Sequence, residues 1–327
     1  MKRGPILVTG GAGFIGSHLI DLLSAESVEF VVLDNLSNGS ASNIPSAISK
    51  SYFIQGDVTD YTLMTKLIRN AAFVVHMACT VGVKNVMSRP LDSIDSNINA
   101  LKKIAYECSI NNVPLVFFSS SLVYSGSNKK NQLFSEDEQT HALGFHPVSI
   151  YVSSKITGEL ICEYYKKTIG LKYIIIRPFN MIGIRQRGDS GMVVPSFVRS
   201  ALVNRSINVY GTGKQTRSFS DVKIAVKLLW ELMDKENSFG EIFNLATTDK
   251  SITILELAEL IKEILDNRIK INFVPLSEIL GDSYRDVDHR SPSLDKLRHS
   301  VPHWRETNLR DILKEIIEYE KRSLHLD

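Results

Sequence analysis

The chain has 327 residues, of which 43% are hydrophobic, and its 38 Lys and Arg residues nearly balance its 36 Asp and Glu residues to give a formal charge of +2. This length suffices for one large domain or two ordinary ones, and the balanced charge argues against a global field that would draw nucleic acid or an anionic membrane. Any anionic ligand must therefore be held by local groups.

Three scattered cysteines, Cys79, Cys108 and Cys162, lack the spacing of a zinc site and are typical of buried thiols in a reducing compartment. No apolar stretch is long enough to cross a bilayer. The first strand-like run starts at Pro5, which leaves no room for a signal peptide. We therefore expect a soluble cytoplasmic protein without a bound metal.

Strand-like and helix-like segments alternate regularly through the first half of the chain. The sequence predicts strands at residues 6–9, 30–34, 52–56, 73–78, 114–121 and 172–178, and helices at 14–24, 60–70, 91–111 and 149–168. The strands are continuously apolar, as in a parallel sheet covered on both faces. The alternation implies right-handed βαβ units, so we predict an α/β fold with a Rossmann-like, doubly wound parallel sheet.

The rhythm changes after Pro178. The sequence predicts a polar loop at 183–191, helices near 193–204, 221–235, 253–265 and 308–322, and a strand at 242–246. We therefore predict a Rossmann domain over residues 1–178 and a smaller C-terminal α/β lobe over residues 179–327. A segment near 219–247 is expected to return to the first domain.

The turn between the first strand and the first helix carries Gly10, Gly13 and Gly16 at three-residue spacing. Glycine lacks the Cβ that would block a diphosphate, and the helix that follows points its free amides and positive dipole end at the anion. Asp34 ends the next strand, where its carboxylate would bind a ribose 2′-hydroxyl and repel a 2′-phosphate. This context predicts a dinucleotide site that favours NAD over NADP, although a turn cap is the alternative for Asp34.

The stretch "IYVSSK" places Tyr151 and Lys155 four residues apart at the start of a predicted helix, and hence on one of its faces. A close ammonium group lowers the pKa of a phenol by about 1–3 units, so the pair predicts a general base for a sugar or alcohol hydroxyl. An amphipathic helix with a snorkelling lysine is the common alternative. The preceding strand ends in "SSS" at 119–121, where ligands lie in such sheets.

These stretches, together with "LDN", "GDVTD", "HMAC", "SSSLVYSG", "RPFN" and "VYGTGKQTRSFSDV", resemble the extended short-chain dehydrogenase/reductases nearly end to end. Within them the chain is similar to the nucleotide-sugar epimerases and dehydratases, and UDP-glucose 4-epimerases look closest. The resemblance implies that Tyr151 takes the proton of the sugar 4-hydroxyl while NAD takes the C4 hydride. The 4-keto sugar would then rotate and receive the hydride on its other face.

The resemblance also implies roles for individual residues. Ser120 would bridge Tyr151 and the sugar oxygen, with a hydrogen bond to backbone as the alternative, and Lys155 would also bind the nicotinamide ribose. Further cofactor contacts would come from Phe14, Ile15, Asn35, Asp57, Val58, Ala78 and Asn97. Substrate contacts would come from Lys84, Asn180, Val193, Asn208, Tyr210, Arg217 and Arg285. His76 is interpreted as a packed structural residue.

Departures from the family pattern narrow the reaction. Family dehydratases carry Asp-Glu, and decarboxylases a Glu, where this chain has Ser121 and Leu122. Because leucine cannot transfer a proton, the sequence favours epimerisation over elimination. Near the C-terminus the phosphate-binding arginine is displaced and Arg285 is its neighbour, while Arg290 could meet a uronic acid carboxylate, a phosphate or solvent.

We therefore predict NAD-dependent epimerisation at C4 of a UDP-hexose, either UDP-glucose and UDP-galactose or their N-acetyl forms. The alternatives are a UDP-uronate 4-epimerase, a dehydratase or reductase with the same Ser-Tyr-Lys triad, and a nucleotide-binding protein without turnover. A homodimer built through the helices near 91–111 and 149–168 is the family expectation. Nucleic acid and membranes are not expected partners.

Overall fold

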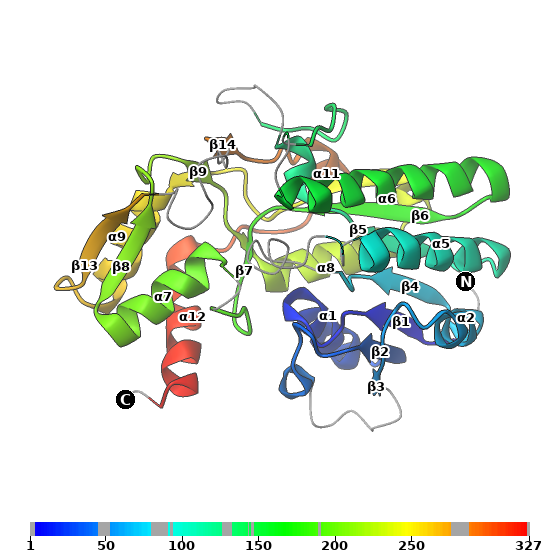
Figure 1. Cartoon of the computed structure of the whole chain (residues 1–327), viewed down its shortest axis with the longest axis horizontal. Coiled ribbons are helices and arrows are strands. Elements are labelled where there is room, and N and C mark those ends of the chain that lie inside the picture. The colour runs from blue at the N-terminus through cyan, green and yellow to red at the C-terminus, as the bar shows by residue number, and fades with distance from the viewer. Residues whose placement is uncertain are drawn as a thin grey trace.

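A parallel sheet forms the centre of the computed structural model (Figure 1), which describes residues 4–44, 53–79, 91, 94–125, 133–142, 144, 147–188, 191–275 and 288–325. Its seven strands are β1 (Ile6–Thr9), β2 (Phe30–Asp34), β3 (Phe53–Gln55), β4 (Phe73–His76), β5 (Leu115–Phe118), β6 (Tyr173–Pro178) and β11 (Glu241–Leu245). They pair in the order β11-β6-β5-β4-β1-β2-β3, and every pair is parallel. The predicted Rossmann-like sheet is confirmed.

Helices cover both faces of this sheet. One face packs on α1 (Phe14–Ala25) and α8 (Val222–Met233), and the other on α2 (Tyr61–Asn70), α5 (Ala100–Ile110) and α6 (Pro147–Ile169). Successive strand side chains point to opposite faces, so Val8 joins the first core cluster and its neighbour Leu7 joins the second. Because both faces are buried, the strands are apolar at consecutive positions.

The helix predicted over 91–111 differs in its first turns. Its described part contains a π-helical turn, η3 (Asp95–Asn99), directly before α5 begins at Ala100. The apolar periodicity of the sequence cannot distinguish a π-helical turn from an α-helical one, because a single π-helical turn shifts the apolar stripe by only one residue. Short 3₁₀ helices are present at η1 (Ala41–Asn43), η4 (Ser121–Tyr124) and η5 (Glu236–Ser238).

A third core cluster lies in the C-terminal half (Figure 1). It packs α7 (Val193–Asn204), α9 (Ile254–Leu265) and α12 (Leu309–Ser323) against the parallel pair β8 (Ser206–Tyr210) and β13 (Lys270–Val274). Between this lobe and the large sheet lie two-residue strands. They are β7 (Met181–Ile182) with β10 (Ser220–Asp221), and β9 (Thr216–Arg217) between β12 (Ile252–Thr253) and β14 (His289–Arg290).

The chain returns to the large sheet twice after Pro178. Strand β11 pairs with β6, within the segment expected to return. The second return, α11 (Asp295–Ser300), lies in the part expected to belong to the lobe, yet Leu294, Leu297 and Val301 join the core cluster that covers β1 and β6. Its helix is too short for a periodic signal. Among the described residues, no helix is both long and apolar enough to cross a bilayer.

Candidate active site

The glycine turn after β1 is tightly packed. Gly10 has a φ of +74°, and a Cβ there would lie 2.7 Å from the backbone nitrogen of Ala78. A Cβ on Gly16 would lie 2.3 Å from the carbonyl oxygen of Gly10, so the helix approaches the turn closely. Gly13 caps α1 without a side-chain hydrogen bond, and the first amides of a helix have no intrahelical partner. The amides of Phe14 and Ile15 therefore fit the diphosphate of a dinucleotide.

The carboxylate of Asp34 holds this turn in place. Its Oδ2 accepts a hydrogen bond from the Ala12 amide at 3.0 Å, and its Oδ1 accepts one from the Leu36 amide at 2.8 Å. Burial raises the pKa of Asp34, and these two hydrogen bonds counteract it. The turn-capping alternative is thus present in the structure. The remaining carboxylate lone pairs could still accept a ribose hydroxyl, which stays a prediction.

Asn35 and Asp57, expected at the adenosine end, lie together. The Asn35 amide donates to Asp57 Oδ2 at 2.7 Å, and the Thr59 hydroxyl donates to Asp57 Oδ1 at 2.7 Å. Burial alone would raise the pKa of Asp57, but the hydrogen bonds from Thr59 and Asn35 outweigh it and lower the pKa. Asp57 is therefore a fixed carboxylate beside the buried side chain of Val58.

Strand β5 and helix α6 bring together the three residues of the predicted triad. Ser120, Tyr151 and Lys155 are all buried, and the Ser120 hydroxyl lies close enough to the Tyr151 phenol to lower its pKa. Ser120 Oγ also accepts a hydrogen bond from the Leu122 amide at 3.2 Å, so its backbone-bonded alternative is realised as well. The Lys155 ammonium donates to the carbonyl of Phe118 at 2.8 Å and lies 5.7 Å from the centre of the Tyr151 ring.

The pKa of Tyr151 departs from the expectation that Lys155 lowers it. Burial raises this pKa, and so does Cys79, while the hydrogen bond from Ser120 and the charge of Arg290 lower it. The Lys155 ammonium is directed at the Phe118 carbonyl instead. The sequence spacing placed the two residues on one face of the helix, but it could not reveal how deeply the phenol is buried.

Two arginines and an asparagine lie on the substrate side. Arg217 in β9 and Arg290 in β14 are register partners, and the Arg290 guanidinium donates to Asn180 Oδ1 at 3.2 Å. The Asn180 amide donates to the carbonyl of Ser218 at 2.9 Å. Because the charge of Arg290 lowers the pKa of Tyr151, Arg290 lies within electrostatic range of the phenol. Arg217 is buried, which argues against a solvated surface arginine.

The other predicted residues are more dispersed. Val193 begins α7, and Asn208 and Tyr210 lie on β8, in the second lobe (Figure 1). Asn97 is buried in the π-helical turn and donates to Ser154 Oγ at 3.0 Å, which ties that turn to α6. The cofactor role of Asn97 stays a prediction, as do the substrate roles on β8. Lys84 and Arg285 lie outside the described residues.

Sequence reasoning missed a buried polar network under the triad. Glu159 falls four residues after Lys155, and its carboxylate binds both Ser119 and Arg177. The four-residue spacing from Lys155 could have indicated that Glu159 lies on the same face of the helix as Tyr151 and Lys155. Its arginine partner is on another strand, which only the fold reveals. In the described part of the chain, no group of three or more His, Cys, Asp or Glu side chains could hold a metal ion.

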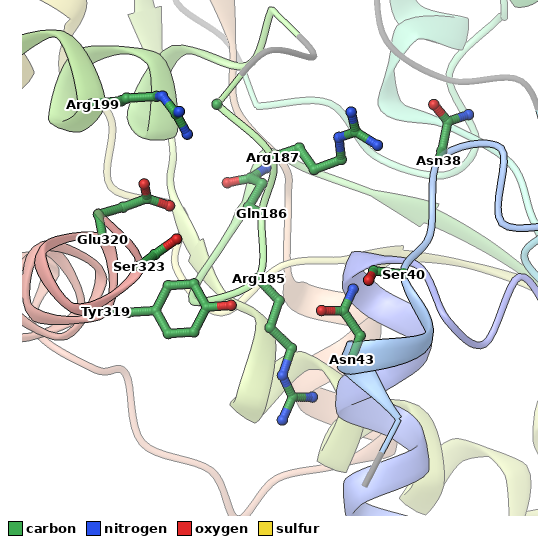
Figure 2. A pocket seen from close by; sticks show the side chains of 11 residues that line it. Asn38, Ser40, Asn43, Arg185, Gln186, Arg187, Arg199, Tyr319, Glu320 and Ser323 are labelled. Atoms are coloured by element: carbon green, nitrogen blue, oxygen red, sulfur yellow. The ribbon is translucent and has the colours of Figure 1, made fainter. Parts of the chain in front are cut away.

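A cavity of about 460 Å³ lies away from the triad, between the loop after β2 and helices α7 and α12 (Figure 2). Its charged side chains are Arg185, Arg187, Arg199 and Glu320, and two of the arginines have an acidic neighbour. Arg185 forms an ion pair with Asp21 at 2.7 Å, and Arg199 counteracts the burial that raises the pKa of Glu320. We interpret this cavity as a polar, arginine-rich cleft outside the reaction site, because none of the triad residues lines it.

The fold and the site together define a Rossmann-like, dinucleotide-binding protein with a tyrosine and a lysine at the carboxyl edge of its sheet. The chain belongs to the NAD dependent epimerase/dehydratase family, whose model matches residues 6–246. It is an enzyme of this NAD-dependent family, and NAD is its cofactor.

Relatives of similar identity carry different activities in their names. The chain is 30% identical over 315 residues to a UDP-N-acetyl-alpha-D-glucosaminuronate decarboxylase of Bacillus cytotoxicus, covering 96% of each chain. It is also 30% identical to a putative UDP-glucose 4-epimerase of Methanocaldococcus jannaschii, covering 97% of this chain and 99% of that one.

Among solved structures, the chain is similar to the UDP-glucose 4-epimerase of Thermotoga maritima with UDP-glucose. The TM-score is 0.87 and the identity 27%, over 98% of this chain and 99% of that one. It is also similar to the UDP-N-acetylglucosamine 4-epimerase of Methanobrevibacter ruminantium in complex with UDP-N-acetylmuramic acid. There the TM-score is 0.86 and the identity 28%, over 99% of this chain and 100% of that one.

Proposed function

We propose that this enzyme inverts C4 of a UDP-hexose through a transient 4-keto sugar. The observation that carries the proposal is Leu122, an apolar residue beside Tyr151 where an acid is needed for elimination or decarboxylation. Its side chain packs with Val148, Tyr151 and Val152 in a small apolar cluster. A leucine there cannot transfer a proton. Proton transfer is therefore confined to the exchange between Tyr151 and the sugar 4-hydroxyl.

Tyr151 is the general base and later the general acid of the proposed reaction. It accepts the proton of the sugar 4-hydroxyl, while Ser120 bridges the phenol and the sugar oxygen. It returns the proton when the hydroxyl is re-formed. The hydrogen bond from Ser120 and the charge of Arg290 favour the phenolate against the effect of burial. When bound, NAD supplies reversible hydride chemistry at C4, so the reaction has no net redox change.

Arg290 favours a second candidate substrate, a UDP-uronate. Its guanidinium is tied to Asn180 and lies close enough to Tyr151 to lower the pKa of the phenol. A carboxylate on C6 of the sugar would pair with it bidentately. A UDP-uronate 4-epimerase would use the same triad and the same proton transfer.

The test is incubation of the enzyme with UDP-glucose, UDP-N-acetylglucosamine and UDP-glucuronate, followed by NMR of the products and absorbance at the NADH band. We expect one C4-inverted sugar and no net NADH. Tyr151→Phe should lose about 100-fold or more of the rate, because it removes the general base. The control is Tyr61→Phe, a phenol exposed at the start of α2.

A 4-keto-6-deoxy sugar, or a pentose with released carbon dioxide, would show that Leu122 does not exclude those reactions. An inverted uronate as the single product would select the second candidate.

A further inference from the structure

We propose that the buried ion pair between Glu159 and Arg177 is a positioning device that holds Ser120 against Tyr151. This inference rests on the proposed epimerisation. It concerns how the chain fixes the end of β5 relative to α6.

One face of α6 contacts three consecutive residues at the end of β5. Tyr151, Lys155 and Glu159 are spaced by four residues, so they lie on one face at successive turns. Lys155 Nζ donates to the carbonyl of Phe118 at 2.8 Å, and Glu159 Oε1 accepts a hydrogen bond from Ser119 Oγ at 2.5 Å. Ser120 lowers the pKa of the Tyr151 phenol, and Leu122, whose amide donates to Ser120 Oγ, packs against Tyr151. The helix therefore fixes both the backbone and the side chains that place Ser120.

Arg177 fixes the Glu159 carboxylate in turn. Its Nε donates to Oε1 at 2.9 Å and its Nη2 donates to Oε2 at 2.6 Å, a bidentate pair whose side chains are only 3% and 9% exposed. Arg177 lies on β6, the sheet neighbour of β5. Because a planar guanidinium bound at two points allows little rotation, the carboxylate can accept from Ser119 in one orientation.

The same guanidinium reaches the chain on the other side of Ser120. Its Nη1 donates to the Tyr124 hydroxyl at 2.7 Å, and that hydroxyl donates to Asn244 Oδ1 at 2.8 Å. Tyr124 ends the 3₁₀ helix η4, which Ser120 caps. Residues before and after Ser120 are thus tied to one buried cation.

This arrangement suits positioning better than stability. Burying an ion pair costs desolvation energy that its attraction barely repays, so a well-packed apolar pair would hold the helix as well. What the ion pair adds is fixed geometry. A displacement of about 1 Å at a reacting group can cost on the order of 100-fold in rate.

The first test is Ser119→Ala, which removes one hydrogen bond to Glu159 and leaves the ion pair intact. We expect kcat to fall about 10-fold for the inverted sugar, with KM and the melting temperature nearly unchanged. The matched control is Ser109→Ala, a buried serine of α5 whose hydroxyl donates to the carbonyl of Ala105 at 2.7 Å. Equal kcat values for the two variants would overturn the proposal.

The second test follows the Tyr151 phenol itself, by ultraviolet difference titration of the NAD-bound enzyme against Tyr151→Phe. Groups that act on this phenol are Cys79, Ser120 and Arg290, with Lys155 one turn away. In Arg177→Met the unpaired Glu159 carboxylate would lie about 12 Å along the helix, and should raise the phenol pKa by about one unit. Adding Glu159→Gln should reverse that shift while kcat stays low.

A melting temperature that falls in Arg177→Met without any change in kcat or in the phenol titration would show a purely structural role. The titration does not depend on the identity of the substrate. A wild-type enzyme without epimerase activity would therefore refute the proposed function, and the titration would still decide the role of the ion pair.

Discussion

At the scale of the residue, His76 shows how burial fixes a protonation state beside the site. Its ring is 2% exposed, its Nδ1 lies 2.8 Å from the Thr9 hydroxyl, and burial together with the Lys155 charge lowers its pKa to about 3. The unfolded chain binds a proton near pH 6.5, whereas the folded chain resists it down to about pH 3. Keeping His76 neutral therefore does not affect the free energy of unfolding above pH 6.5. It lowers that free energy as the pH falls from 6.5 toward 3.

His76→Gln should remove this pH dependence, because glutamine can still bond Thr9 but does not titrate. Between pH 7 and pH 5 the wild type should lose about 2 kcal/mol more unfolding free energy than the variant, measured by urea denaturation. Losses of the same size in both proteins would mean that other groups carry the acid sensitivity.

The chemistry of single residues was only partly readable in the sequence. Local spacing predicted the Tyr151–Lys155 pair and the glycine turn, because each lies within one stretch of chain. It did not predict that burial raises the Tyr151 pKa, or that Arg290 counteracts it, because both effects depend on tertiary packing and Arg290 is 139 residues away in the chain. Arg177 was missed because it lies on β6, whereas its partner Glu159 lies on α6, and only the fold brings the two together.

At the scale of the element, the packing of α6 against β5 depends on Gly158. A Cβ at this position would lie 2.5 Å from Phe117 Cζ and 2.8 Å from Leu101 Cδ2. Gly158→Ala should force α6 away from β5, with an overpacking cost of about 1–3 kcal/mol that exceeds the gain in helix propensity of about 1 kcal/mol. We expect a lower melting temperature and a lower kcat, since the displaced helix carries Tyr151.

Ser153→Ala, at an exposed position of the same helix, is the control and should be neutral or slightly stabilising. If Gly158→Ala raised the melting temperature as that control does, the close contact with Phe117 would be too soft to set the position of α6.

Elements with a long apolar pattern were predicted to within a few residues, as α6 shows: 149–168 was expected and Pro147–Ile169 is observed. Parallel strands buried on both faces give the strongest pattern. The pairs β8 with β13 and β9 with β14 were not predicted. Their strands are short or half-exposed, and their partners are distant in the chain, so no local pattern marks them. Register, which brings Arg217 beside Arg290, is likewise set by tertiary packing.

At the scale of the whole molecule, helices α5 and α6 carry several large apolar side chains that are exposed to solvent. Large side chains exposed there are Tyr106, Ile110, Leu160, Tyr164 and Ile169. The aromatic rings are continuous, since Tyr165 lies 6.2 Å from Tyr106 and 5.5 Å from Tyr164, between ring centres. An apolar surface across two long helices is typical of a protein interface. It agrees with the homodimer that the family resemblance leads us to expect, which stays a prediction.

The dimer prediction can be tested without touching the site, because Tyr151 and Lys155 lie on the buried face of α6. Leu160 and Tyr164 are 65% and 61% exposed, and replacing both with Glu would place like charges opposite each other across a two-fold interface. Light scattering should give twice the 36.6 kDa protomer mass for the wild type and the single mass for the double variant. Val203→Glu, on the exposed surface of α7, should leave the mass doubled. A wild-type protein with the mass of one protomer would refute the dimer. A double variant that keeps the mass of two protomers would show that the interface does not involve Leu160 and Tyr164.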